Sequence, residues 1–151
     1  MPGTGNLAVP FPEYFKVAIR VFLVEDMRQM QGVISDLLNV VGTFDIVCTM
    51  RTEAEAIQWL KDHPGEWDLA LIDLILEQGT GMGVVPRARA AAPSAQVLVL
   101  SDYATPGVRQ HCLKLGASAV FQKSQEMRAF MDYCAALADP DPESKAESTA
   151  S

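Results

Sequence analysis

Acidic side chains follow two short, largely apolar runs of the sequence. Asp73 comes directly after Leu69–Ile72. Glu25 and Asp26 come directly after Val17–Val24. Apolar runs of this length are typical of strands buried on both faces of a parallel sheet. Because the carboxyl ends of such strands form the edge that binds ligands, we expect the three carboxylates to lie close together at that edge.

Two further polar side chains end later apolar runs. Ser101 follows Gln96–Leu100, and Lys123 follows Ala119–Gln122. In one parallel sheet both side chains would reach the edge that carries the carboxylates. A lysine supplies a positive point charge and a serine hydroxyl donates a hydrogen bond, and together these groups suit a tetrahedral phosphoryl group.

The chemistry of this set points to a hard metal ion. Three carboxylates in one crevice raise one another's pKa unless a cation joins them. Oxygen ligands without a nearby histidine or cysteine favour Mg²⁺, bound through one or two carboxylates and water. An aspartate beside such an ion can attack phosphorus and form an aspartyl phosphate. The pattern therefore predicts a Mg²⁺-dependent phosphoacceptor site.

Taken singly, each of these side chains also has an ordinary structural explanation. Asp73 could be a solvated strand end, and Glu25 with Asp26 could be acids favoured by the dipole of a following helix. Lys123 could be a surface lysine and Ser101 a loop hydroxyl. Their joint arrival at one edge is what favours a functional site.

Helical periodicity separates the apolar runs and predicts the elements that position the site. We expect strands over residues 17–24, 45–50, 68–73, 96–100 and 119–122. We expect helices over residues 27–41, 52–63, 84–91, 105–115 and 124–138, with N-caps at Thr52, Thr105 and Ser124. The third helix should begin near Val84, after a loop through Gly79–Gly83, because Pro86 is tolerated best in a first turn.

Alternation of five strands with five helices predicts an α/β fold with helices on both faces of a parallel sheet. We expect the flavodoxin-like strand order 2-1-3-4-5, which makes strands one and three neighbours at the ligand-binding switch point. The domain should span residues 17–138. Residues 1–16 should form an irregular extension, and residues 139–151 an acidic disordered tail.

Charge and composition exclude several classes of partner. The formal net charge of −7 argues against nucleic acid and against an anionic membrane surface. The three cysteines have no metal-ligand spacing, so we expect reduced thiols in a cytoplasmic protein. No apolar run is long enough to predict a membrane span.

At the site residues the chain resembles the receiver domains of two-component response regulators, of the CheY-like, stand-alone type. The matching segments are Val24-Glu25-Asp26, Leu71-Ile72-Asp73, Gly81, Leu100-Ser101, Gly116-Ala117 and Phe121-Gln122-Lys123. The resemblance implies that Asp73 is the phosphoacceptor. It further implies that Mg²⁺ is held by Asp26, Asp73 and the backbone carbonyl of Ile75, with Glu25 acting through water. It also implies that Ser101 and Lys123 hold phosphoryl oxygens and that Phe121 turns inward on activation.

Three positions depart from the receiver pattern. Ser124 replaces the usual proline after the lysine, so we expect a trans bond there, since a cis bond before a non-proline residue costs about 2.5–4 kcal/mol. Glu77 replaces the usual proline four residues after the phosphoacceptor, and Asp102 replaces a small residue. With Ile75 and Tyr103 at positions that tune hydrolysis in the family, we expect a shielded, slowly hydrolysing phosphoryl group.

The resemblance implies a signalling phosphoacceptor rather than an enzyme, limited to self-catalysed phosphotransfer and autodephosphorylation. The donor would be a histidine kinase or a histidine phosphotransfer protein. A downstream protein would contact the face made by the fourth helix, fifth strand and fifth helix, and we expect no output domain after Asp139.

The alternative is a pseudo-receiver that binds partners without phosphorylation. A phosphohydrolase resembling haloacid dehalogenases is disfavoured because Ile75 stands where a general acid is needed, and a flavodoxin lacks support because no hydroxyl-rich loop follows the first strand.

Overall fold

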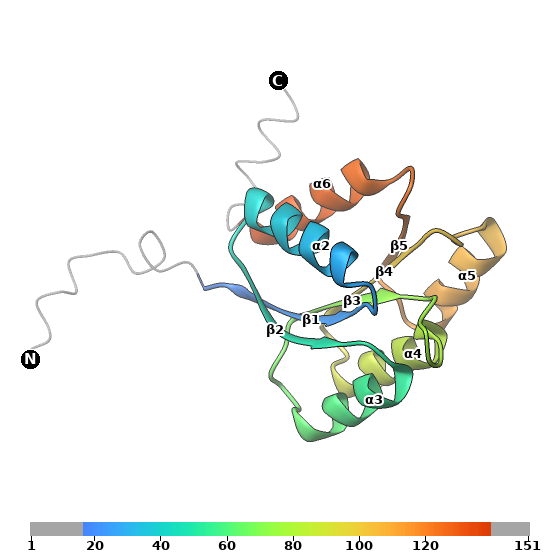
Figure 1. Ribbon diagram of the computed structural model, residues 1–151. Coiled ribbons are helices and arrows are strands. Elements are labelled where there is room, and N and C mark those ends of the chain that lie inside the picture. The colour runs from blue at the N-terminus through green and yellow to red at the C-terminus, as the bar shows by residue number, and fades with distance from the viewer. Residues whose placement is uncertain (1–16, 140–151) are drawn as a thin grey trace, which may run out of the picture.

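The computed structural model describes residues 17–139 of the chain. Within them, five parallel strands form one sheet in the order β2-β1-β3-β4-β5 (Figure 1). The strands are β1 (Ile19–Val24), β2 (Phe44–Met50), β3 (Leu69–Asp73), β4 (Gln96–Ser101) and β5 (Ala119–Gln122). The predicted fold class and strand order are confirmed. The extension expected over residues 1–16 lies outside the described residues, as does the tail expected over residues 139–151 apart from Asp139.

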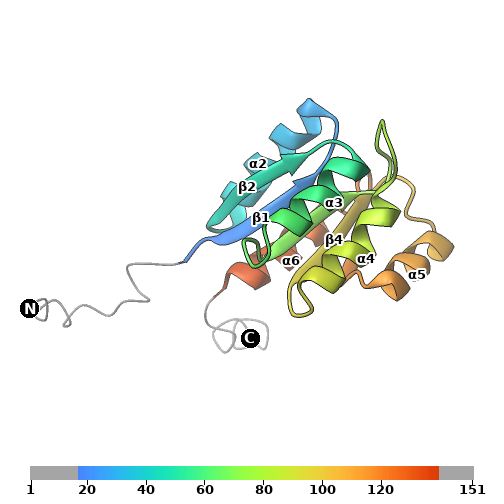
Figure 2. The ribbon, with the colours of Figure 1, turned by 90° about the horizontal axis from the view of Figure 1, so that it is seen from below.

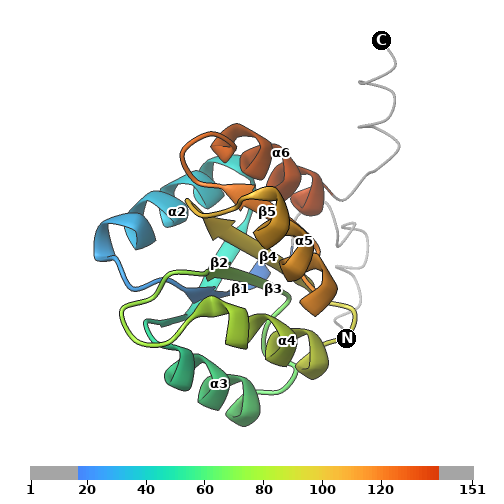
Figure 3. The ribbon, with the colours of Figure 1, turned by 90° about the vertical axis from the view of Figure 1, so that its right-hand side faces the viewer.

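Helices cover both faces of the sheet. On one face lie α2 (Arg28–Val41) and α6 (Met127–Ala138), and on the other lie α3 (Glu53–Asp62), α4 (Gly81–Ala91) and α5 (Pro106–Leu115) (Figures 1 and 3). Figure 2 looks onto the face that α3, α4 and α5 cover. None of the helices within residues 17–139 has the length and hydropathy of a membrane span.

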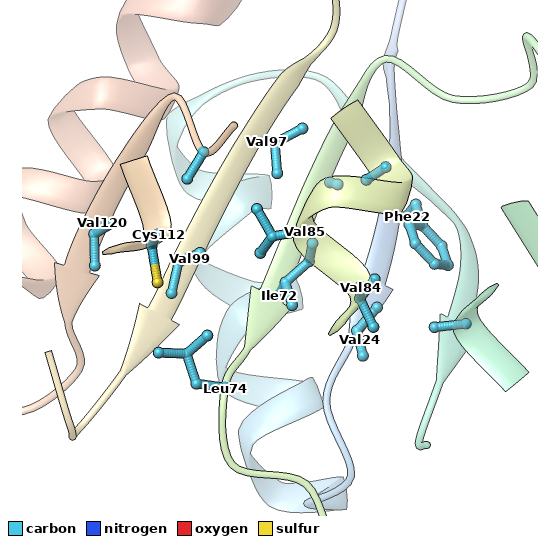
Figure 4. Packing of buried hydrophobic residues seen from close by; sticks show 14 of the residues in the cluster. Phe22, Val24, Ile72, Leu74, Val84, Val85, Val97, Val99, Cys112 and Val120 are labelled. Atoms are coloured by element: carbon cyan, nitrogen blue, oxygen red, sulfur yellow. The ribbon is translucent and has the colours of Figure 1, made fainter. Parts of the chain in front are cut away.

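Side chains of the strands alternate between two apolar cores. On β1, Phe22 contributes to the core under α3, α4 and α5, whereas Leu23 contributes to the core under α2 and α6. Ile72 of β3 and Val99 of β4 belong to the first of these cores (Figure 4). Burial of one such side chain stabilises the fold by about 1.5–3 kcal/mol. Strands buried on both faces explain the continuous apolar runs of the sequence.

Helix α4 begins earlier than the sequence predicted, at Gly81 instead of Val84. Thr80 is its N-cap, because the Thr80 side chain accepts a hydrogen bond from the Met82 amide at 3.1 Å. A Cβ on Gly81 would collide with the carbonyl oxygen of Asp73. Glycine is therefore needed for close approach to the end of β3 and does not mark a loop. Pro86 consequently lies inside the helix and not in its first turn.

Two of the three predicted helix caps are present. Thr52 accepts from the Glu55 amide at 3.1 Å, and Thr105 accepts from the Val108 amide at 3.3 Å. Ser124 is not a cap, because α6 begins only at Met127. The reason lies in tertiary contacts that hold the residues before α6 in a turn.

The turn before α6 is organised by the Glu126 carboxylate. Its Oε1 accepts a hydrogen bond from the Gln122 amide at 2.8 Å and from the Arg109 guanidinium at 2.7 Å. Arg109 also donates to the Val120 carbonyl oxygen at 2.5 Å, so α5 is tied to both β5 and the turn. These contacts place Lys123, the first residue after β5, without requiring a proline after it.

The three cysteines are free thiols. Burial raises the pKa of Cys134 to about 12 and that of Cys48 to about 11. Burial also raises the pKa of Cys112. The thiol form therefore dominates at neutral pH, and none of the three sulfurs has the thiolate character that reactivity requires.

Arg89 lies at the edge of the sheet opposite to the carboxyl ends of the strands and links the connections there. Its guanidinium donates to the carbonyl oxygens of Gly116, Pro93 and Ala95 at 2.9, 3.0 and 2.7 Å. It also donates to the Ser118 hydroxyl at 3.0 Å. The end of α4 is thereby joined to the connections before β4 and β5.

We predict that Arg89→Ala lowers the free energy of unfolding by about 3 kcal/mol, because several carbonyl oxygens lose a charged donor. Chemical denaturation of the full chain measures this change. Arg87→Ala is the matched control, since Arg87 is exposed on the same helix, and its effect should stay within about 0.5 kcal/mol. Equal effects of the two substitutions would contradict the prediction.

Candidate functional site

The three predicted carboxylates meet at the carboxyl edge of the sheet. Asp73 is the last residue of β3, and Glu25 and Asp26 follow β1, which pairs directly with β3. One carboxylate oxygen from each of the three lies within 4.8 Å of the others. Glu25 and Asp73 are only 1% and 7% exposed, while Asp26 is partly exposed. The cluster is thus set into the protein and open on the side of Asp26.

Lys123 reaches into this cluster from the residue after β5. Its Nζ lies 2.8 Å from Glu25 Oε1 and 3.0 Å from Asp73 Oδ2. The Lys123 amide donates to the Ser101 carbonyl oxygen at 3.2 Å, which continues the pairing of β5 with β4. Residues 17–139 contain no cis peptide bond, so the bond before Ser124 is trans as expected.

Burial dominates the electrostatics of the two inner carboxylates. It raises the pKa of Glu25 and of Asp73, and the ammonium of Lys123 offsets this only in part. Burial opposes the charged form of Lys123 as well, but the two carboxylates outweigh it and raise the pKa of the lysine. Three carboxylates facing one ammonium leave two negative charges when all four groups are ionised. A divalent cation matches that excess.

Backbone amides complete the support of each carboxylate. Glu25 accepts from the Met27 amide at 3.1 Å, and Asp73 accepts from the Ile75 amide at 3.3 Å. Asp26 Oδ2 accepts from the Glu77 amide at 2.6 Å. The ligand atoms on offer are all oxygens, and this set suits Mg²⁺ better than a softer metal ion.

Ser101 is fully buried as the last residue of β4, which pairs with β3. Its Oγ accepts a hydrogen bond from the Tyr103 amide at 3.1 Å. The hydroxyl proton remains available for donation to an oxygen atom at this edge. The structure therefore gathers Glu25, Asp26, Asp73, Ser101 and Lys123 at one edge, as their sequence positions predict.

Phe121 is not among the side chains that meet in the acidic cluster. Its ring packs edge-on against Phe130 and Tyr133 of α6, with centroid distances of 5.8 and 5.6 Å. Val120, its neighbour on β5, lies on the opposite face near Cys112 (Figure 4). Phe121 therefore packs as a core residue in this structure, and its role in switching stays a prediction.

The β3–α4 loop borders the site. The sequence predicted a loop through Gly79–Gly83 but not its contact with Glu53. Glu53, at the start of α3, accepts from the Thr80 amide at 2.8 Å, and its own amide donates to the Gln78 carbonyl oxygen at 3.2 Å. A Cβ on Gly79 or on Gly83 would collide with the Glu53 side chain. These glycines were the available signal for the contact, but nothing in the sequence named Glu53 as the partner.

A polar, open cavity of about 260 Å³ lies beside Asp26, between this loop and the start of α3. It is lined by Asp26, Arg51, Thr52, Glu55, Glu77 and Gln78. Ile75 and Tyr103 are 53% and 61% exposed, so neither side chain is buried over Asp73. The cluster is reached from solvent on this side.

We predict that Lys123→Met lowers the free energy of unfolding by about 3 kcal/mol at pH 7 without divalent cations. Two buried carboxylates then lack a counter-charge. An acid whose folded pKa lies above its unfolded value destabilises the fold as the pH rises through the folded pKa. The deficit should therefore shrink as the pH is lowered and Glu25 and Asp73 take up protons.

Denaturant titrations at several pH values measure this dependence. Lys114→Met is the control, because Lys114 is exposed on α5, and its effect should stay below about 1 kcal/mol. A deficit for Lys123→Met that does not change with pH would contradict the assignment of the loss to unpaired carboxylates.

Comparison with known proteins agrees with this geometry. A family model described as the response regulator receiver domain matches residues 21–135. Two curated proteins of Bacillus subtilis (strain 168) are similar to the chain. The uncharacterized transcriptional regulatory protein YvfU is 25% identical over 115 residues, covering 76% of this chain and 56% of YvfU. The transcriptional regulatory protein DesR is 23% identical over 105 residues, covering 70% of this chain and 51% of DesR. The chain thus matches about half the length of these two relatives.

Solved structures show the same fold. The CheX–CheY–BeF3–Mg²⁺ complex from Borrelia burgdorferi contains a similar chain with a TM-score of 0.66 and 18% identity, covering 76% of this chain and 88% of that one. The phosphorylated cyanobacterial phytochrome response regulator RcpA has a TM-score of 0.65 and 23% identity, covering 80% and 91%. Fold, family model and the position of the acidic cluster agree. The chain belongs to the response regulator receiver domain family of two-component systems.

Proposed function

We propose that the chain is a phosphoacceptor of a two-component phosphorelay, in which Asp73 takes a phosphoryl group from a phosphohistidine donor. The donor is a histidine kinase or a histidine phosphotransfer protein. The observation that carries this proposal is the Lys123 ammonium between Glu25 and Asp73 in a cluster of three carboxylates. Receiver domains bind Mg²⁺ at such an acidic cluster, and the oxygen-only ligands of this site fit that ion.

Asp26, Asp73 and the carbonyl oxygen of Ile75 would hold Mg²⁺, and Glu25 would act through water. The ion supplies positive charge to the phosphoryl oxygens. A carboxylate oxygen of Asp73 forms the new bond to phosphorus while the bond from phosphorus to the donor nitrogen breaks and its electron pair stays with the histidine. Lys123 then holds one phosphoryl oxygen and the Ser101 hydroxyl donates to another, in contacts that replace those of the free protein.

Ser101 connects this chemistry to the rest of the fold. Because its Oγ accepts from the Tyr103 amide, a shift of the hydroxyl toward a phosphoryl oxygen pulls on the loop before α5. Arg109 of α5 contacts both the Val120 carbonyl oxygen and Glu126, so a movement of α5 reaches β5 and the start of α6. We infer that the α5–β5–α6 face presents the phosphorylated state to a partner protein. The net charge of −7 favours a protein over nucleic acid or an anionic membrane.

A pseudo-receiver that binds partners without phosphorylation is the alternative. Asp102 favours it, because this exposed acid follows Ser101 directly and adds negative charge where an anionic donor must approach. The close contacts of Lys123 favour the phosphoacceptor. Phosphate uptake separates the two functions.

We predict that the full chain gains one phosphoryl group from acetyl phosphate in the presence of Mg²⁺, and that Asp73→Asn abolishes the gain. An amide cannot serve as the nucleophile. Intact mass spectrometry measures the uptake, and Mg²⁺-dependent changes of amide shifts around Asp73 on adding beryllofluoride provide a second measurement. Asp68→Asn is the matched control, because Asp68 flanks the other end of β3 and pairs with Arg20 at 2.9 Å.

This control should accept phosphate as the wild type does. Uptake by Asp73→Asn would disprove the assignment of the phosphoacceptor. No uptake and no beryllofluoride response in the wild type would favour the pseudo-receiver.

We predict a slowly hydrolysing phosphoryl group, because Ile75 and Tyr103, which are exposed in the free protein, would close over the phosphoryl group and limit the approach of water. Replacing both by alanine should shorten the lifetime several-fold. Loss of label from phosphorylated protein measures it. Leu113→Ala removes an exposed apolar side chain from α5 and should leave the lifetime unchanged. A wild-type lifetime of seconds would contradict the prediction.

A further inference from the structure

Asp26 differs from the other two carboxylates in what holds it. Glu25 and Asp73 each accept from one backbone amide and from Lys123. Asp26 accepts from the Glu77 amide alone among the hydrogen bonds of residues 17–139, and that bond is 2.6 Å long. It joins residues 51 positions apart in the chain. The orientation of Asp26 therefore depends on the β3–α4 loop.

We propose that the backbone amide of Glu77 is the positioning group that orients Asp26 toward the divalent cation, which makes the affinity for Mg²⁺ depend on the β3–α4 loop. This inference rests on the proposed function of the site. A carboxylate that gives one oxygen to an amide keeps its other oxygen for a cation. Hydrogen bonds to metal-ligating side chains fix their orientation, and loss of such a bond typically lowers metal affinity by 10- to 100-fold.

The loop that carries this amide is attached on both sides of Glu77. Before it, the Leu74 carbonyl oxygen accepts from the Thr80 hydroxyl at 3.0 Å. After it, the Gln78 carbonyl oxygen accepts from the Glu53 amide, and the Thr80 amide donates to the Glu53 carboxylate at 2.8 Å. The amide is thus held in place before any cation binds, so orientation of Asp26 costs little at the moment of binding.

The amide and the side chain of Glu77 can be separated experimentally. The side chain is exposed and lines the cavity beside Asp26. Glu77→Ala removes the carboxylate and keeps the N–H group. Glu77→Pro removes both the carboxylate and the N–H group. The two variants differ in the N–H group that bonds Asp26 and in the backbone restriction that proline adds, and the phosphorylation rate at saturating Mg²⁺ is the control for the second difference.

The test is a Mg²⁺ titration of the wild type, Glu77→Ala and Glu77→Pro by calorimetry, using the full chain. We expect Glu77→Pro to bind Mg²⁺ about tenfold more weakly than Glu77→Ala. At saturating Mg²⁺ the two variants should accept phosphate from acetyl phosphate at equal rates, a recovery that a damaged fold would not show. Equal affinity of the two variants, tighter binding by Glu77→Pro, or unequal rates at saturation would overturn the proposal.

The Glu77 amide of the wild type supplies a measurement that needs no substitution. Its proton should resonate downfield and resist exchange with solvent, both before and after Mg²⁺ is added, because the bond to Asp26 persists. Loss of this protection on adding Mg²⁺ would overturn the proposal. Failure of the wild type to bind Mg²⁺ would instead disprove the proposed function, and the inference with it.

Discussion

The site depends on a buried lysine held between two buried carboxylates. Withdrawing an ion from water costs several kcal/mol, and Lys123 meets this cost only because Glu25 and Asp73 lie 2.8 and 3.0 Å from its Nζ. The positive charge of Lys123 does not balance the cluster, since Asp26 adds a third negative charge that no ammonium of the cluster faces. In the proposed function, a divalent cation would offset this excess of negative charge. A phosphoryl group on Asp73 would then replace carboxylate contacts of Lys123 with its own oxygens and keep the lysine paired.

Strand order is what brings these groups together. β1 and β3 are neighbours in parallel register, so Glu25 and Asp26 leave the sheet beside Asp73. β5 is separated from β3 by β4, and Lys123 must therefore extend across a distance of roughly 10 Å, two strand spacings, to meet Asp73. Ser101 ends the intervening strand, so a long side chain at position 123 is needed to reach Asp73.

Most of the fold and the meeting of five site residues could be predicted because both follow from periodicity. Continuous apolar runs indicate strands buried on both faces, and parallel strands bring their carboxyl ends to one edge. The start of α4 could not be predicted in this way, because glycine serves close approach to Asp73 as well as loops. The cap expected at Ser124 failed because Glu126 is engaged by Arg109 from another helix.

Two further features could not be predicted from the sequence, for a different reason. Alternation along β5 places Phe121 and Val120 on opposite faces, but it does not say which face lies under α6. The amide that reaches Asp26 belongs to the backbone, which every residue except proline supplies, so only coordinates reveal that Glu77 provides it. Side-chain chemistry can be predicted from residue types, whereas backbone donors follow from loop geometry.

Polar groups at the two edges of the sheet differ in how they affect the stability of the fold. At the edge away from the site, the guanidinium of Arg89 is surrounded by carbonyl oxygens and needs nothing further to be satisfied. At the carboxyl edge, burial raises the pKa of Glu25 and Asp73, which means that their charged forms weaken the fold at neutral pH. A ligand that binds only the folded state adds to its stability in proportion to its occupancy. The proposed Mg²⁺ would therefore bind the same carboxylates whose charged forms lower the stability of the free protein, and offsetting their charge would contribute to its binding free energy.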